Sequence, residues 1–156
     1  MDTLKAIFVI LICLSINISY SQAYWIYLQG EEYYSGNSTT PQNFERAFFL
    51  FEESARMGCP MAEEKMGTCY YLGHGVTQSY RKAFHWTKRA AKHGIASSQY
   101  QLGYMFFWGE GCQKSANKAY KWFYRAADRG DTTAIDFLQQ FSLYIHRKYV
   151  WSDTTN

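Results

Sequence analysis

The sequence predicts an all-α fold built from stacked helical hairpins. The first observation is a repeat, because the stretch YYLGHG at residues 70–75 returns 36 residues later as FFWGEG at 106–111. The second is composition: 19% of the residues are aromatic and only two are proline, which favours compact helical structure over disorder. The third is length, since 156 residues are enough for one domain with a hydrophobic core.

Residues 1–23 are predicted to be a secretory signal peptide. Lys5 supplies a short positive region, and residues 6–18 (AIFVILICLSINI) form a largely apolar run. Ser21 and Ala23 are small residues at positions −3 and −1 of a cut before Tyr24. The apolar run is shorter than the roughly 20 residues of a spanning helix. We therefore expect an exported protein, periplasmic or secreted, with no membrane span after cleavage; an uncleaved N-terminal anchor is the alternative.

An internal repeat organises the chain after this segment. A shift of 36 residues aligns both glycines of the Gly-x-Gly, a Lys-Ala pair, a tryptophan and an Arg-Ala-Ala run. Farther upstream the shift becomes 37, and we expect the first loop, NSTTPQ, to be one residue shorter than its counterparts. A period of this length predicts stacked units. Their predicted ranges are 24–58, 59–94 and 95–130, with a capping helix at 131–149 and a flexible tail at 150–156.

Each unit is predicted to hold two helices. The first buries positions such as Ala62, Met66, Gly67 and Tyr70, and the Gly-x-Gly ends it, because glycine tolerates the left-handed conformation at a helix C-terminus. The second helix should begin after an N-cap that accepts a backbone N–H. The expected caps are Ser79, Ser115 and, with a first-turn proline, Thr40-Pro41. Trp86 is expected to fill the space beside the small residues of the helix contact.

These residues resemble a known family. The pattern A-x-x-x-L-G-x-x-Y-x-x-G-x-G, followed by K-A-x-x-W-x-x-K/R-A-A-x-x-G, is similar to the Sel-one-like repeat, a relative of the tetratricopeptide repeat. Residues 62–94 and 98–130 match it well, and residues 24–58 are a degenerate copy. The resemblance implies an α-solenoid whose first helices line a concave face. It also implies an adaptor or scaffold role, often in exported bacterial proteins that in some cases engage host proteins.

One catalytic signature, Ser-x-x-Lys, occurs twice, beginning at Ser79 and at Ser115. It is the nucleophile motif of penicillin-recognising enzymes, and the resemblance adds weight because a cysteine-rich branch of the family is linked to penicillin binding and β-lactamase activity. The companion motifs Ser-Asp-Asn and Lys-Thr-Gly are absent from the sequence. The disulfide positions of that branch are occupied here by Ala55, Glu63, Ala91 and Gln99. We expect two helix caps and no enzyme; an enzyme acting on β-lactams or peptidoglycan fragments is the alternative.

No cofactor or metal site is expected. The histidines have no metal-ligand spacing such as His-x-x-x-His. They are His74, His85, His93 and His146. The three cysteines after the signal segment, Cys59, Cys69 and Cys112, allow at most one disulfide in an exported chain.

A row of aromatic side chains is the first candidate binding site. On the first helix of the unit at 59–94, the core does not use positions 64, 68 and 71. The equivalent positions of the other units, 36 or 37 residues away, are mostly aromatic. Large rigid aromatic groups with polar tips suit peptide binding, and packing against neighbouring helices is the alternative role of each. The predicted groove residues are Tyr34, Tyr71, Tyr100, Tyr104 and Phe107, with Tyr27 in the same row. The expected partner is a protein or peptide, and no nucleic acid.

Segregated charge is the second candidate. Residues 65–129 hold eleven basic and two acidic side chains, and the basic ones concentrate on the second helix of each unit. Such a face fits an acidic partner or an anionic envelope surface, and an ordinary solvated outer face is the alternative. The residues of the predicted basic face are Arg81, Lys82, Lys88, Arg89, Lys118, Lys121 and Arg125.

Overall fold

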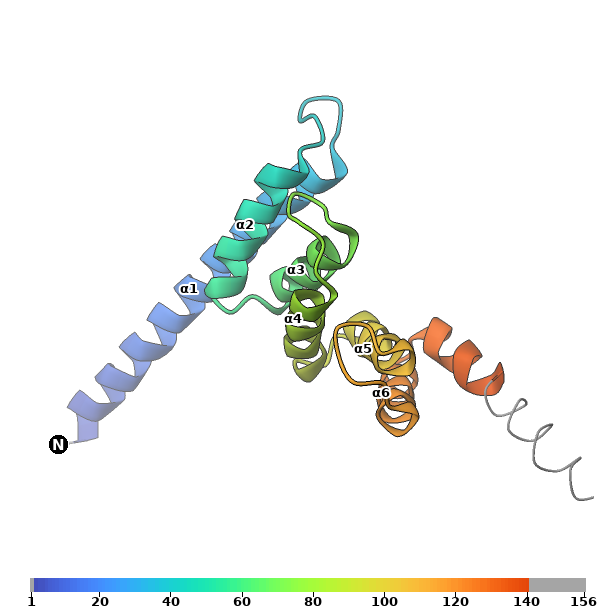
Figure 1. Cartoon of the computed structure of the whole chain (residues 1–156). Helices are drawn as coiled ribbons and strands as arrows, with labels where there is room; N and C mark the ends of the chain where they lie inside the picture. The colour runs from blue at the N-terminus through green and yellow to red at the C-terminus, as the bar shows by residue number, and fades with distance from the viewer. Residues whose placement is uncertain (1, 141–156) are drawn as a thin grey trace, which may run out of the picture. The chain divides into compact units, whose positions relative to one another are not determined.

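The computed structural model describes residues 2–140 and contains helices joined by turns, with no strand in that range (Figure 1). The all-α prediction is confirmed. The helices are α1 (Asp2–Ser35), α2 (Phe44–Arg56), α3 (Pro60–Leu72), α4 (Tyr80–Lys92), α5 (Ala96–Trp108) and α6 (Ala116–Asp128). Residues 132–140 are also helical, where the capping helix was expected, and the predicted tail at 150–156 lies outside the described residues. The chain forms two compact units, residues 1–79 and residues 80–156, which are described separately.

Helix α1 continues without a break through the predicted cut between Ala23 and Tyr24. Ala23 is fully buried, and its carbonyl oxygen accepts a 2.6 Å hydrogen bond from Ser54 Oγ on α2. A cut before Tyr24 would remove this contact between the two helices. Of the residues from 19 to 140, whose side chains the structure describes, none belongs to a helix long and apolar enough to cross a membrane.

Phenylalanines on helices α2 and α6 fill the space beside the close-packed glycines. In the first unit a Cβ on Gly30 would lie 2.6 Å from Phe51 Cε1, and in the second a Cβ on Gly103 would lie 2.8 Å from Phe123 Cδ1. Both phenylalanines are buried, at 0% and 1% exposure. On α4 the residue equivalent to these phenylalanines is the buried Thr87, and Trp86, which was expected to fill the space beside Gly67, is half-buried.

Each Gly-x-Gly uses its two glycines differently. Gly73 and Gly109 are left-handed C-caps with φ of 79° and 83°, and their N–H groups donate to the Cys69 and Met105 carbonyls at 2.8 Å. The second glycine, here Gly111, has φ of 68°, and a Cβ there would overlap the Tyr80 carbonyl at the start of α4. Gly75 meets the start of α2 in the same way, at the Phe44 carbonyl. The second glycine therefore lets each turn press against the start of the second helix of the preceding hairpin.

The turns then lead into N-caps, with one correction. Ser115 Oγ accepts the Lys118 N–H at 3.4 Å, as expected of a cap. In the first hairpin the cap is Asn43, whose Oδ1 accepts the Arg46 N–H at 2.8 Å, so the Thr40-Pro41 cap is wrong. The physical reason is that the Asn43 N–H, which a cap at Thr40 would bind, donates to the Tyr33 carbonyl at 2.8 Å.

The first loop is also one residue longer than its counterparts, and not shorter as expected. It runs from Gly36 to the cap Asn43, whereas the equivalent turn runs from Gly109 to the cap Ser115. The Asn37 side chain accommodates the added residue by bonding Thr39 Oγ1 at 2.8 Å.

The three cysteines from Cys59 on are free thiols. Cys59 and Cys69 are buried, and burial raises the pKa of the Cys69 thiol to about 12. Cys112 is half-buried, and its Sγ donates to the Met105 carbonyl at 3.5 Å. These thiols act as small apolar groups in the packing.

We expect alanine at Gly111 to destabilise the protein more than alanine at Gly130. Both residues have left-handed φ, 68° and 83°, so both variants carry a conformational cost of about 1–2 kcal/mol. Only at Gly111 does the new Cβ also meet a backbone, that of Tyr80, whereas at Gly130 nothing lies within 4 Å. Urea unfolding followed by circular dichroism should show a difference of at least ~1 kcal/mol. Equal losses in the two variants would mean that the turn does not press on α4.

The variant Gly103→Leu should lower the free energy of unfolding by ~1–3 kcal/mol or more, because the side chain is forced into Phe123. Adding Phe123→Ala should restore part of the loss, since it vacates the same space. The measurement is a double-mutant cycle of urea unfolding. Strictly additive losses would contradict the contact.

Candidate functional site

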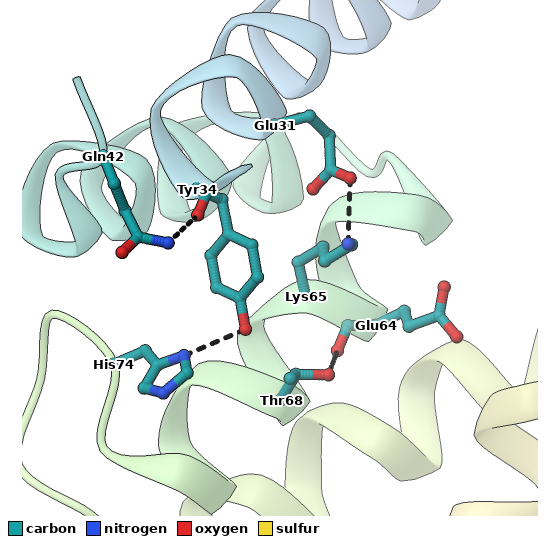
Figure 2. Close-up of polar contacts among 7 residues, drawn as sticks. All are labelled: Glu31, Tyr34, Gln42, Glu64, Lys65, Thr68 and His74. Carbon is teal, nitrogen blue, oxygen red and sulfur yellow. Dashed lines mark hydrogen bonds and ion pairs between the residues drawn. The ribbon is translucent and has the colours of Figure 1, made fainter. Parts of the chain in front are cut away.

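A polar cluster surrounds Tyr34 in the first unit (Figure 2). The Tyr34 hydroxyl and His74 Nδ1 are 2.9 Å apart, and the His74 ring stacks on Phe44 with 4.1 Å between centroids. Lys65 Nζ lies 5.2 Å from the centre of the Tyr34 ring and 2.9 Å from Glu31 Oε2. Figure 2 shows Tyr34 between His74 on one side and the Glu31–Lys65 pair on the other. The predicted groove residue is thus held in position by polar contacts.

Glu31 is a site residue that sequence reasoning missed. It lies on α1 between Tyr27 and Tyr34, at the position that Thr68 and Tyr104 occupy in the later units. Its Oε1 is buried and has no hydrogen-bond partner among the described residues. The 37-residue shift that relates the first unit to the second aligns Glu31 with Thr68, and this is the signal in the sequence that points to Glu31. Glu31 adds an acceptor and a charge to a row that otherwise looked aromatic.

Burial moves the ionisation of two tyrosines of this row to higher pH. Burial, reinforced by the nearby Glu31 carboxylate, raises the pKa of Tyr27 to about 12. Burial also raises the pKa of Tyr34, with smaller contributions from Cys69 and Glu31. Both side chains are neutral phenols at physiological pH, as tyrosines ordinarily are, and the Tyr34 hydroxyl is bonded to His74 Nδ1.

On α3 the same row continues with Glu64, Thr68 and Tyr71. Thr68 Oγ1 donates a hydrogen bond of 3.2 Å to the Glu64 carbonyl. Tyr71 is half-buried, and its carbonyl accepts a hydrogen bond of 2.7 Å from Gln78 Nε2 in the following turn. Gln42 makes the equivalent bond to the Tyr34 carbonyl, at 2.9 Å. The two turns therefore hold the row in the same manner.

In the second unit the row lies on α5 as Tyr100, Tyr104 and Phe107, all half-buried. Tyr100 packs on Phe123 at 5.4 Å, and burial raises its pKa. Phe107 meets Phe137 edge to face at 5.6 Å. Tyr100 and Phe107 thus take part in packing, the alternative role weighed for each residue, while retaining exposed surface.

Tyr104 lies beside the exposed Trp108 at the end of this row. Their ring centroids are 6.1 Å apart, and Trp108 is 55% exposed at the end of α5. Sequence reasoning did not single out Trp108, although the aromatic stretch FFW before the turn contains it.

The predicted basic face is solvent-exposed apart from Arg89, which is half-buried. The Arg89 guanidinium stacks over the Trp86 ring at 4.7 Å, and Arg125 stacks over Trp122 at 4.6 Å in the next repeat. Cation–π contacts of this kind fix the direction of an otherwise mobile side chain. The tryptophans of the repeat thus support arginines at the surface.

Further predicted residues of this face also lie near rings: Lys88 is 5.9 Å from Phe84 and Lys118 is 5.5 Å from Phe106. The remaining members, Arg81, Lys82 and Lys121, are exposed.

The Ser-x-x-Lys motif at Ser115 is used as a helix cap. The Ser115 hydroxyl binds the backbone N–H of Lys118, and the Lys118 ammonium lies toward the Phe106 ring. Among the described residues, no three His, Cys, Asp or Glu side chains are grouped so that they could hold a metal ion. Ala91 and Gln99 stand where the resemblance places a disulfide of the cysteine-rich branch. They are joined instead by a hydrogen bond of 3.1 Å from Gln99 Nε2 to the Ala91 carbonyl.

The Sel1 repeat model matches residues 22–59, 60–95 and 96–131 of the chain. No curated protein sequence matches. Among solved structures, the chain resembles a protective antigen of uropathogenic Escherichia coli with an SLR fold, at 28% identity and a TM-score of 0.72 over 74% of this chain. It also resembles a Sel1 repeat protein from Oxalobacter formigenes, at 29% identity and a TM-score of 0.68 over 72% of this chain.

The chain spans 25% and 44% of the length of those two proteins. Cysteine-rich protein B of Helicobacter pylori shares the fold at 20% identity and a TM-score of 0.60, with 76% of this chain and 93% of that protein covered. Sel1 repeats commonly form protein–protein interaction modules and are typically non-enzymatic scaffolds. With three matched repeats over most of its length and the helical hairpins that they require, the chain belongs to the Sel1 repeat family.

Proposed function

We propose that this protein is an exported interaction module that binds a segment of a partner protein through the aromatic row on the first helices of its hairpins. The observation that carries the proposal is Tyr104 with its neighbour Trp108, large aromatic side chains left partly open on α5. Aromatic groups of this kind dominate binding energy at interfaces, because they bury a large area with few rotamers to lose.

The first unit offers the same row with polar groups added. The Tyr34 hydroxyl is bonded to His74, and the partly exposed Glu31 and Lys65 carry opposite charges on the other side of the Tyr34 ring (Figure 2). A peptide backbone needs donors and acceptors in alternation, and this cluster provides both. We infer that each unit presents its own part of the row, with polar groups around Tyr34 in the first unit and with Tyr104 and Trp108 in the second.

Export is the second part of the proposal. It rests on the predicted signal peptide at residues 1–23 and is supported by the E. coli neighbour, which is described as a protective antigen. The basic face would then meet an acidic partner or an anionic envelope surface. No observation favours the enzymatic alternative, since Ser115 is occupied as a cap.

With a partner identified by pull-down and mass spectrometry, Tyr104→Ala should weaken its binding by at least roughly thirtyfold, about 2 kcal/mol, as expected of a central interface aromatic. The matched control is Tyr124→Ala, which removes an equally large side chain that is 59% exposed on α6. It should change the affinity by less than about threefold. Isothermal titration calorimetry with each variant makes the comparison.

The pair Lys88→Glu and Lys121→Glu tests the other face in the same assay. If this reversal abolishes binding while Tyr104→Ala has no effect, the partner docks on the basic face and the groove proposal is wrong.

A further inference from the structure

A hollow of about 360 Å³ lies in the second unit, apart from the aromatic row. The end of α4 and the turn at Gly94 form one wall, Gln99 of α5 forms the floor, and the last turns of α6 form the other wall. Its volume falls at the lower end of the range for small-ligand sites, roughly 300–1,000 Å³. One or two amino-acid residues of a ligand would fill it.

The hollow is rich in cations, and neighbouring residues position two of them. Three of its side chains are cationic, Lys92, Arg125 and Arg129, and Asp128 is its one carboxylate. No ion pair joins Asp128 to these cations in the part of the chain that the structure describes. The stack on Trp122 directs the Arg125 guanidinium. An excess of oriented, unpaired guanidinium groups is suited to a carboxylate.

The Arg129 guanidinium packs directly against Gly94, in space that any side chain at this position would occupy. A Cβ on Gly94 would lie 2.9 Å from Arg129 Cζ and 3.0 Å from both terminal nitrogens, so the flat guanidinium rests on the bare glycine. At the equivalent glycines of the other hairpins, Gly58 and Gly130, nothing lies within 4 Å. This arrangement is specific to one hairpin and is not a general property of the repeat.

The floor of the hollow contains a buried acceptor without a donor. Gln99 is 4% exposed, its Nε2 donates to the Ala91 carbonyl, and its Oε1 has no partner among the described residues. Reversing the amide would place its oxygen against the Ala91 oxygen, so the orientation is fixed. A buried acceptor left unpaired is costly, and a small shift of the Gln99 side chain toward the hollow would let a ligand N–H satisfy it.

We propose that this hollow binds the C-terminal residue of a peptide. The terminal carboxylate would pair with Arg125 and Arg129, and the N–H of the last peptide bond would donate to Gln99 Oε1. A carboxylate with an amide N–H one carbon atom away is the defining chemistry of a peptide C-terminus. Inorganic phosphate fits less well, because it carries more negative charge toward Asp128 and has no N–H for Gln99.

The test is an NMR titration of the purified protein with N-acetyl-alanyl-alanine, following the Gln99 side-chain amide and the Trp122 indole N–H. The free acid should shift both signals with a Kd on the order of 1 mM, as expected of so small a ligand. The same peptide with an amidated C-terminus should bind at least about tenfold more weakly, because it has lost the charge that the arginines recognise. Inorganic phosphate should leave the Gln99 signal unmoved.

Two variants locate the effect. Arg129→Gln should reduce the affinity for the free acid about tenfold or more, whereas Lys121→Gln, which removes one charge from an exposed part of α6 outside the hollow, should change it by less than about twofold. Both substitutions are at exposed positions and leave the core intact. The proposal is overturned if the amidated peptide binds as well as the acid, if Arg129→Gln and Lys121→Gln behave alike, or if phosphate shifts Gln99 as the peptide does.

Discussion

The structure depends on the contact that the second glycine of each turn makes with the start of the helix before it. Gly75 meets the Phe44 carbonyl and Gly111 meets the Tyr80 carbonyl, so closely that no Cβ fits. This contact connects each hairpin to the preceding one through the backbone, which side-chain substitutions elsewhere do not alter. In a repeat protein, contacts between neighbouring units supply the stability that no hairpin has alone.

The same contact places the candidate site of the first unit. His74 lies between Gly73 and Gly75, and when the turn presses on α2 its ring meets Phe44 and its Nδ1 meets the Tyr34 hydroxyl. In the second unit the residue between the glycines is Glu110, and no comparable ring stack forms there. The turn is therefore constant in the backbone, while the residue between its glycines varies with the surface that each unit presents.

Periodicity is visible in the sequence itself, so the features that follow from it could be predicted. They are the repeat, the all-α class and the burial of Ala62, Met66, Gly67 and Tyr70. The Thr40 cap failed because the Asn43 N–H, which a cap at Thr40 would bind, donates to the Tyr33 carbonyl instead, and local propensity does not decide such a contact. Glu31 was missed because a search for aromatic residues passes over a carboxylate. The hollow around Gln99 needs three-dimensional packing: Arg129 and Gly94 are 35 residues apart in sequence.

Hydrogen exchange at three equivalent amides tests the hairpin turn most directly. The N–H groups of Asn43, Ser79 and Ser115 donate to the carbonyls of Tyr33, Tyr70 and Phe106, each at 2.8 Å, and so close the three turns. They should exchange orders of magnitude more slowly than the exposed amide of Gln113, and at rates close to one another. Exchange of all three at the rate of Gln113 would contradict the account, because turns closed in this way cannot leave those amides open to water.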